Sequence, residues 1–148
     1  MDNIIFLDID GVLNGHEWCH MPAVPKINVK CIRVLNQLCL TCKARCVLIS
    51  SWRGKLVKHN WPVEVAQWVL ETHGFTGELC GVVDGTGHTP EDKRWAIERY
   101  VRANNTVKYV VIDDTPVQNF RIIRPNPAIG LEPYHITLAK EMLDGQHS

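Results

Sequence analysis

Three short apolar runs stand out along the chain, at residues 4–7, 46–49 and 109–112. Each run is continuous rather than alternating, as expected for strands that are buried on both faces of a parallel sheet. Two weaker runs, at residues 79–83 and 120–123, are candidates for a fourth and a fifth strand. The pattern therefore predicts a mostly parallel, five-stranded sheet.

Helical patterns lie between the predicted strands, and most of them begin at a capping side chain or a first-turn proline. Alternation of strands and helices predicts an open α/β sheet, here in one domain that spans residues 1–148. The predicted helices run from the Asn28 cap to Cys42, from Pro62 to a stop at Gly74, from the Thr89 cap and Pro90 to Asn104–Asn105, and from Tyr134 to Leu143.

Carboxylates follow two of the predicted strands. Asp8 and Asp10 come directly after the first run, and Asp113 and Asp114 come after the run at 109–112. Ligands of parallel α/β sheets bind beyond the carboxyl ends of the strands, so these acids are expected at one rim. A divalent cation would relieve their repulsion, and all-oxygen ligation favours Mg²⁺. Either pair alone could be a turn or a helix cap, but the two pairs together favour a functional site.

Two further side chains belong to the same predicted rim. Ser50 ends the second strand, and Lys93 stands in the first turn of the helix that begins after Thr89. The positive end of the helix macrodipole disfavours a cation in that turn. An anion or an acid cluster in front of Lys93 would explain its position, and a solvated surface lysine is the alternative.

Four features of the chain resemble, in the same order, the four motifs of the haloacid dehalogenase (HAD) superfamily. They are the segment Asp8-x-Asp10-Gly-Val, Ser50 at the end of a strand, Lys93 at the start of a helix, and Asp113–Asp114 at the end of a later strand. The segments FLDIDGVLN, LISSWRG and YVVIDD are similar to a compact branch of HAD phosphatases, known from Swiss Army Knife RNA repair proteins and as stand-alone proteins. The resemblance spans residues 4 to about 131. It implies a single Rossmann-like, three-layer α/β domain with a minimal cap or none.

The resemblance also implies a Mg²⁺-dependent phosphomonoesterase. Asp8 would attack phosphorus to form an aspartyl-phosphate, and Asp10 would protonate the leaving oxygen and then activate water. Ser50 and Lys93 would hold the phosphate, and the second acid of the first motif favours a phosphatase over a dehalogenase. The implied catalytic residues are Asp8, Asp10, Ser50 and Lys93, and the implied metal ligands are Asp8, Asp10 through its backbone carbonyl, Asp113 and Asp114, with Asp114 preferred over Asp113 as a direct ligand.

HAD enzymes usually gain specificity from cap insertions, and the intervals available here are short. Residues 11–27 are too few for a folded cap but could form a flap that contains His16 and Trp18. Residues 54–89 must already supply a helix and a strand of the core. An open site is therefore expected, which suits polynucleotide ends or proteins and also admits small nucleotides.

Ser51, Trp52 and Arg53 directly follow Ser50 and are candidates for substrate contact. An indole can stack on a base, and a guanidinium can hold a phosphate. The alternative for Trp52 is packing under the rim, with Arg53 salt-bridged beside it. The sequence leaves these two interpretations about even.

The charge composition limits which classes of partner the protein is expected to bind. The chain has 16 basic and 16 acidic residues among 148, so its formal net charge is zero. This balance argues against binding long nucleic acid or a membrane surface by bulk charge, but it permits a site for one phosphate. We therefore expect as substrate a phosphorylated small molecule or a nucleic-acid end, with a slight preference for a mononucleotide or a short terminus.

The chain contains no apolar stretch of the roughly 20 residues that a membrane helix needs, and its first residues lack the features of a signal peptide. A cytoplasmic protein with reduced thiols is expected. Cys39, Cys42 and Cys46 have a spacing that could seed a zinc or iron–sulfur site. Because no histidine or fourth cysteine follows at ligand spacing, packing in the core is the preferred interpretation.

Other functions weighed against the sequence are less well supported. A phosphatase of another small phosphometabolite or of a phosphoprotein would need the same residues. A phospho-accepting receiver domain would place its acidic pair first and its lysine after the last strand, whereas Lys93 here precedes Asp113–Asp114. A non-catalytic HAD-like scaffold would usually have lost the nucleophile or the lysine, and both are present.

Overall fold

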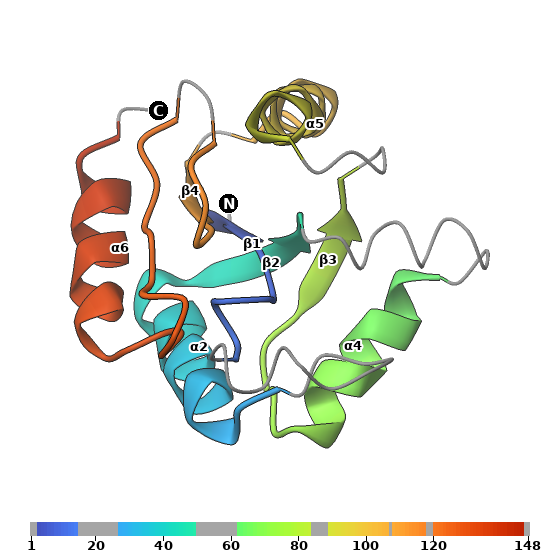
Figure 1. Cartoon of the computed structure of the whole chain (residues 1–148). Helices are drawn as coiled ribbons and strands as arrows, with labels where there is room; N and C mark the ends of the chain where they lie inside the picture. The colour runs from blue at the N-terminus through green and yellow to red at the C-terminus, as the bar shows by residue number, and fades with distance from the viewer. Residues whose placement is uncertain are drawn as a thin grey trace.

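The computed structural model describes residues 3–14, 27–49, 62–83, 89–106, 108–117 and 120–146. These residues form a parallel sheet of four strands in the order β3-β2-β1-β4 (Figure 1). The predicted α/β fold with a parallel sheet is confirmed. The strands are β1 (Asn3–Leu7), β2 (Ala44–Leu48), β3 (Leu79–Val82) and β4 (Tyr109–Ile112), and the helices are α2 (Val29–Cys42), α4 (Val63–Thr72), α5 (Pro90–Ala103) and α6 (Tyr134–Asp144).

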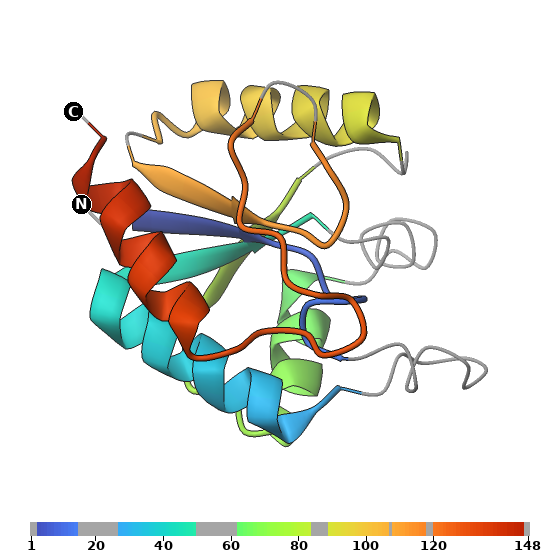
Figure 2. The same ribbon diagram turned by 60° about the vertical axis from the view of Figure 1, so that its left-hand side comes forward.

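The sheet lies between two layers of helices, with α5 on one face and α2, α4 and α6 on the other (Figure 2). In β1, Ile5 and Leu7 belong to the core beneath α2, α4 and α6, whereas Ile4 and Phe6 belong to the core beneath α5. Successive side chains of a strand point to opposite faces. A strand covered on both sides must therefore be apolar at every position, which explains the continuous runs in the sequence.

The order of the strands defines where a ligand site is expected. From β1 the chain passes through α2 to β2 and through α4 to β3, always in one direction along the sheet. It then passes over α5 to β4, which pairs with the opposite side of β1. The strand order thus reverses between β1 and β4, and α/β proteins bind ligands beyond the carboxyl ends of the strands at such a point.

The helix boundaries follow the predicted caps closely. The side chains of Asn28 and Thr89 each accept a hydrogen bond from a backbone N–H of the following turn. Two boundaries differ slightly from the prediction. Pro62 has extended backbone angles and precedes α4 rather than opening it. The helix α5 ends at Ala103, and Asn105 then takes a positive φ of 51° that breaks the helical path.

The predicted fifth strand at 120–123 is wrong as a strand and survives as a single bridge. Ile123 pairs in parallel with Ile112 of β4. Its N–H donates to the carbonyl oxygen of Val111 at 2.9 Å, and its carbonyl oxygen accepts from the N–H of Asp113 at 3.1 Å. The pairing does not extend to either side of this residue.

Two residues explain why the ladder stops. The next donor of a parallel ladder after Ile123 would be residue 125, and Pro125 has no N–H to give. In the other direction, the side-chain amide of Gln146 already donates to the carbonyl oxygen of Tyr109 at 2.6 Å and accepts from its N–H at 3.0 Å. The edge of β4 is therefore covered by a side chain where the fifth strand would have begun.

The cysteines lie where the packing interpretation put them. Cys39 and Cys42 are on the buried side of α2, and Cys46 is a fully buried residue of β2. The sulfur atoms of Cys39 and Cys46 lie 3.6 Å apart within the core. In the described part of the chain, no three cysteines gather closely enough to hold a metal ion.

The structure also bears on the cap and on membranes. The described residues 62–83 supply α4 and β3, as the short second interval required. Among the helices described, none combines the length and the apolar character needed to cross a membrane.

Candidate active site

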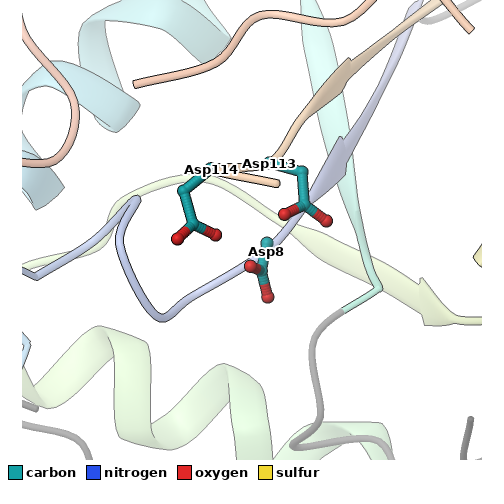
Figure 3. A group of neighbouring side chains, drawn as sticks. All are labelled: Asp8, Asp113 and Asp114. Atoms are coloured by element: carbon teal, nitrogen blue, oxygen red, sulfur yellow. The ribbon is translucent and has the colours of Figure 1, made fainter. Parts of the chain in front are cut away.

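The strand register brings together acids that are far apart in the sequence. Leu7 of β1 is level with Ile112 of β4, and the N–H of Asp8 donates to the carbonyl oxygen of Ile112 at 3.0 Å. Asp8 and Asp113, the next residues of the two strands, consequently lie side by side. Figure 3 shows Asp114 beside them, and one carboxylate oxygen from each of the three acids lies within 4.8 Å of the others. This cluster occupies the point where the strand order reverses.

Lys93 supplies a positive charge to the cluster. It comes from the first turn of α5 and is almost completely buried, with 7% of its surface exposed. Its Nζ lies 2.6 Å from Oδ2 of Asp113 and 3.9 Å from Oδ2 of Asp8. The acid cluster expected in front of this lysine is therefore present, and it offsets the unfavourable helix dipole.

One ammonium group does not balance three carboxylates. Burial and the neighbouring Asp113 raise the pKa of Asp8 to about 8, although Lys93 acts in the opposite direction. Burial and Asp113 likewise raise the pKa of Asp114. Excess negative charge in a partly dry site is relieved by a divalent cation, and carboxylate oxygens are the donors that Mg²⁺ prefers. The residues present fit a Mg²⁺ ion.

The two consecutive acids differ in how far their oxygens are already engaged. Asp113 is fully buried, and its Oδ2 accepts the bond from Lys93. Its Oδ1 accepts from both the N–H and the hydroxyl of Thr115, each at 3.0 Å. Asp114 is only partly buried. Asp114 is thus the more accessible of the two for direct contact with a cation.

Asp10 is held apart from the three clustered acids. Its Oδ1 accepts a hydrogen bond from Nδ2 of Asn14 at 3.2 Å, and Oδ1 of Asn14 accepts from the N–H of Gly11 at 2.8 Å. Asn14 is fully buried, so this small turn is anchored by a side chain of the protein interior. The Asp10 carboxylate is partly exposed and is not one of the three acids whose oxygens lie within 4.8 Å of one another.

Gly11 allows the loop after β1 to approach β4 closely. Its φ is +78°, a conformation that residues with a side chain rarely adopt. A Cβ atom at this position would also lie only 2.6 Å from Cγ of Asp114. Any other residue would therefore displace either the loop that carries Asp10 or the Asp114 carboxylate.

The predicted site residues fall into two groups. The structure brings together the acids of the cluster with Lys93, and it places Asp10 on the adjoining turn. The predicted residues that lie outside the described residues are Ser50, Ser51, Trp52, Arg53, His16 and Trp18.

Sequence reasoning missed the residues that orient the acids. Asn14 fixes Asp10, and Thr115 fixes Asp113. A signal existed for Thr115, because an aspartate in a turn commonly accepts a hydrogen bond from the backbone N–H two residues later. Asn14 stands inside the quoted segment FLDIDGVLN, but nothing in one sequence says which carboxylate it meets.

A parallel α/β sheet with an acid cluster and a buried lysine at its reversal point defines a HAD-type domain. The family model described as "HAD domain in Swiss Army Knife RNA repair proteins" matches residues 4–136, and the chain belongs to this family. Membership supports a hydrolase of the phosphatase type in general terms. Searches of curated proteins and of solved structures gave no significant match.

Proposed function

We propose that the protein is a Mg²⁺-dependent phosphomonoesterase that works through an aspartyl-phosphate and acts on a nucleotide or on the terminal phosphate of a nucleic acid. One observation carries this proposal. Asp8, Asp113 and Asp114 converge with Lys93 where the strand order reverses, while Asp10 stands on the next turn, outside the cluster. A nucleophile and a separate acid are thus available beside a cation site.

Asp8 and Asp10 divide the chemistry between them. A carboxylate oxygen of Asp8 forms a bond to phosphorus as the ester bond to the leaving oxygen breaks, and the proton of Asp10 passes to that oxygen. In the second half, Asp10 takes a proton from water, whose oxygen attacks phosphorus and releases inorganic phosphate and the Asp8 carboxylate. Asn14 holds Asp10 on the exposed side of the turn for both transfers.

Asp8 and Asp114, with the backbone carbonyl of Asp10, would hold the Mg²⁺ ion, and Asp113 would support Asp114 from behind. When bound, the ion neutralises the acids and stabilises the negative charge of the transferring phosphoryl group. Lys93 adds a second positive charge next to the nucleophile and fixes Asp113. Ser50 remains the predicted partner of a phosphate oxygen.

The substrate class rests on two further points. The family is described from RNA repair proteins, and this description favours a nucleic acid or one of its building blocks as substrate. The zero net charge suits a partner that presents one or a few phosphates rather than a long backbone. Both points favour a nucleotide or a terminus over an internal nucleic-acid site.

A phosphatase screen with and without Mg²⁺ tests the proposal. The substrates are 5′- and 3′-mononucleotides, 5′- and 3′-phosphorylated oligonucleotides, sugar phosphates and phosphopeptides. We expect Mg²⁺-dependent release of phosphate from a nucleotide or oligonucleotide. Preference for a sugar phosphate or phosphopeptide would redirect the substrate, and no release from any compound would favour a binding scaffold.

A matched pair of variants shows whether the activity belongs to this site. Asp8→Asn removes the proposed nucleophile. Asp144→Asn removes an exposed carboxylate of α6 that pairs with Lys140, and it should behave as the natural protein does.

A further inference from the structure

Arg124 is fixed next to the acid cluster by the bridge that replaces the predicted fifth strand. The N–H and the carbonyl oxygen of Ile123 both form hydrogen bonds with the backbone of the β4 segment. These bonds lie at the carboxyl end of β4, where Asp113 and Asp114 follow the strand. Pro125, directly after Arg124, is buried and has a fixed φ. The backbone of Arg124 is consequently held between two constrained residues at the carboxyl edge of the sheet.

The side chain of Arg124 is exposed, but a hydrogen bond limits where its guanidinium can lie. Its Nη2 lies 3.4 Å from the backbone carbonyl oxygen of Asp114, which places the guanidinium next to this residue of the cluster. Among the described residues, no carboxylate lies within ion-pair distance of it. Lys93 is buried against Asp113, so it faces the cluster from within. Arg124 instead presents a positive charge at the outer rim, beside the acid that is more accessible to a cation.

We propose that Arg124 binds a second phosphate of the substrate, next to the one that is hydrolysed, and so selects substrates that carry two. This inference rests on the proposed function. Guanidinium groups bind phosphate through two parallel hydrogen bonds, and a single long bond to a carbonyl leaves most of the Arg124 donors available. The ligand is a phosphate monoester or diester attached to the same nucleotide as the reacting phosphate.

The experiment compares substrates that differ only in the second phosphate. The values of kcat/KM are measured for nucleoside 5′- and 3′-monophosphates, for the 3′,5′-bisphosphate and for a 5′-phosphorylated dinucleotide. The bisphosphate offers the second charge as a monoester and the dinucleotide offers it as a diester, so the two substrates distinguish these sources. The quantity of interest is the ratio of kcat/KM between a two-phosphate substrate and its one-phosphate counterpart.

We expect Arg124→Ala to lower this ratio about tenfold, through KM rather than kcat, because a charge-assisted hydrogen bond is lost. Arg124→Lys keeps the charge but not the planar fork, and it should restore part of the ratio. The control is Arg121→Ala. Arg121 is an exposed arginine of the same segment that lines a cavity beside Tyr109, at the other end of β4, and its loss should leave the ratio unchanged.

The outcomes separate this inference from the proposed function. An unchanged ratio in Arg124→Ala overturns the inference while leaving a working phosphatase. An equal loss for one- and two-phosphate substrates, with a lower unfolding temperature, also overturns it, because Arg124 would then only support Asp114. If the natural protein hydrolyses none of these compounds, the proposed function fails. Calorimetric binding of the mono- and bisphosphates to the natural protein and to Arg124→Ala then tests Arg124, and the same ratio of affinities in both proteins would overturn its role.

Discussion

The polar groups at the two ends of β4 differ in how completely they are paired. At the carboxyl end, Asp113 and Asp114 meet Asp8, and in the described part of the chain Lys93 is the cation that pairs with them. At the amino end, the amide of Gln146 satisfies both the N–H and the carbonyl group of Tyr109. One end of the strand carries charge in excess, and at the other both backbone groups of Tyr109 are paired.

This difference indicates what each end contributes. Groups that are fully paired stabilise the fold and need no partner from solution. Like charges held together in a partly buried place reduce stability until a counter-charge binds. Proteins commonly retain such unfavourable arrangements where they bind or react. Substitutions at the two ends should therefore separate activity from stability.

The largest effect is expected from Asp8→Asn, which should lower kcat/KM for a phosphate ester at least about 1,000-fold because the proposed nucleophile is lost. The fold should remain intact or become more stable without metal. The pKa of Asp8 is raised from 3.8 to about 8, so between these values the folded state binds a proton that the unfolded chain has released, and the carboxyl group lowers stability as the pH rises. Thermal unfolding at pH 7 measures this, and full turnover by the variant would contradict the mechanism.

Asp114→Asn should raise the Mg²⁺ concentration needed for half-maximal activity by about tenfold or more, since an amide is a weaker ligand than a carboxylate. A titration of activity with MgCl₂ measures the shift. Thr115→Val is the control, because it removes one bond to Asp113 without removing a carboxylate. An unchanged titration in Asp114→Asn would assign the direct contact to Asp113.

Asn14→Ala should lower kcat about tenfold by releasing Asp10, and it should cost about 1–3 kcal/mol in the free energy of unfolding because the N–H of Gly11 loses its acceptor. The matched control is Asn36→Ala. Asn36 likewise uses both ends of its amide, toward the backbone groups of Gly74 and Thr76, but it is partly exposed and lies on α2. Equal kcat in the two variants would show that Asp10 needs no support from Asn14.

Gln146→Ala should act at the paired end alone. Loss of both bonds to Tyr109 is expected to lower the free energy of unfolding by about 1–2 kcal/mol. Both kcat and KM should stay unchanged, because the carboxyl end of β4, where the proposed site lies, is held by Ile123 rather than by Gln146. Urea unfolding and steady-state kinetics check the two statements, with Gln37→Ala on the exposed side of α2 as the control. A fall in kcat would show that the two ends of β4 are coupled.

The smallest effect concerns His135, a buried and satisfied group outside the site. Its Nδ1 accepts the N–H of Glu132 at 2.9 Å, and burial lowers its pKa below 6.5. The neutral ring contributes stability that is complete above pH 6.5 and is lost as the pH falls toward the pKa of the folded state.

The slope from His135 should not exceed about 1.4 kcal/mol per pH unit. Urea unfolding of the natural protein and of His135→Gln between pH 5 and 7 isolates this contribution, because other groups that titrate in this range are common to both proteins. Parallel curves for the two proteins would show that His135 is not responsible.

Apolar runs and caps were sufficient to predict most of the fold. Runs buried on both faces located all the strands that the structure describes, and the Thr89 cap located α5 and hence Lys93. The prediction of a fifth strand was wrong because strand propensity does not show whether the backbone groups of the neighbouring strand are free to pair. Gln146, more than 20 residues away, covers Tyr109, and Pro125 lacks a donor.

The sequence was sufficient to predict which acids lie together at the ends of the strands. Asp8 and Asp113–Asp114 could be placed at one rim because parallel strands share a direction. The orientation of each carboxylate could not be deduced, because it depends on Asn14 and Thr115 through side-chain hydrogen bonds. Arg124 was missed for a related reason, since its place depends on a bridge of one residue.

Gly11 joins two elements that the proposed reaction would use separately. The loop carrying the acid Asp10 rests directly on the carboxylate of Asp114, with no room for a methyl group between them. The turn proposed to transfer the proton and the carboxylate proposed to hold the cation are therefore in direct contact, and a shift of one would move the other. Descendants of this sequence can vary at the exposed positions of α4 and α6, but we expect this turn to keep its glycine for as long as both proposed tasks are performed.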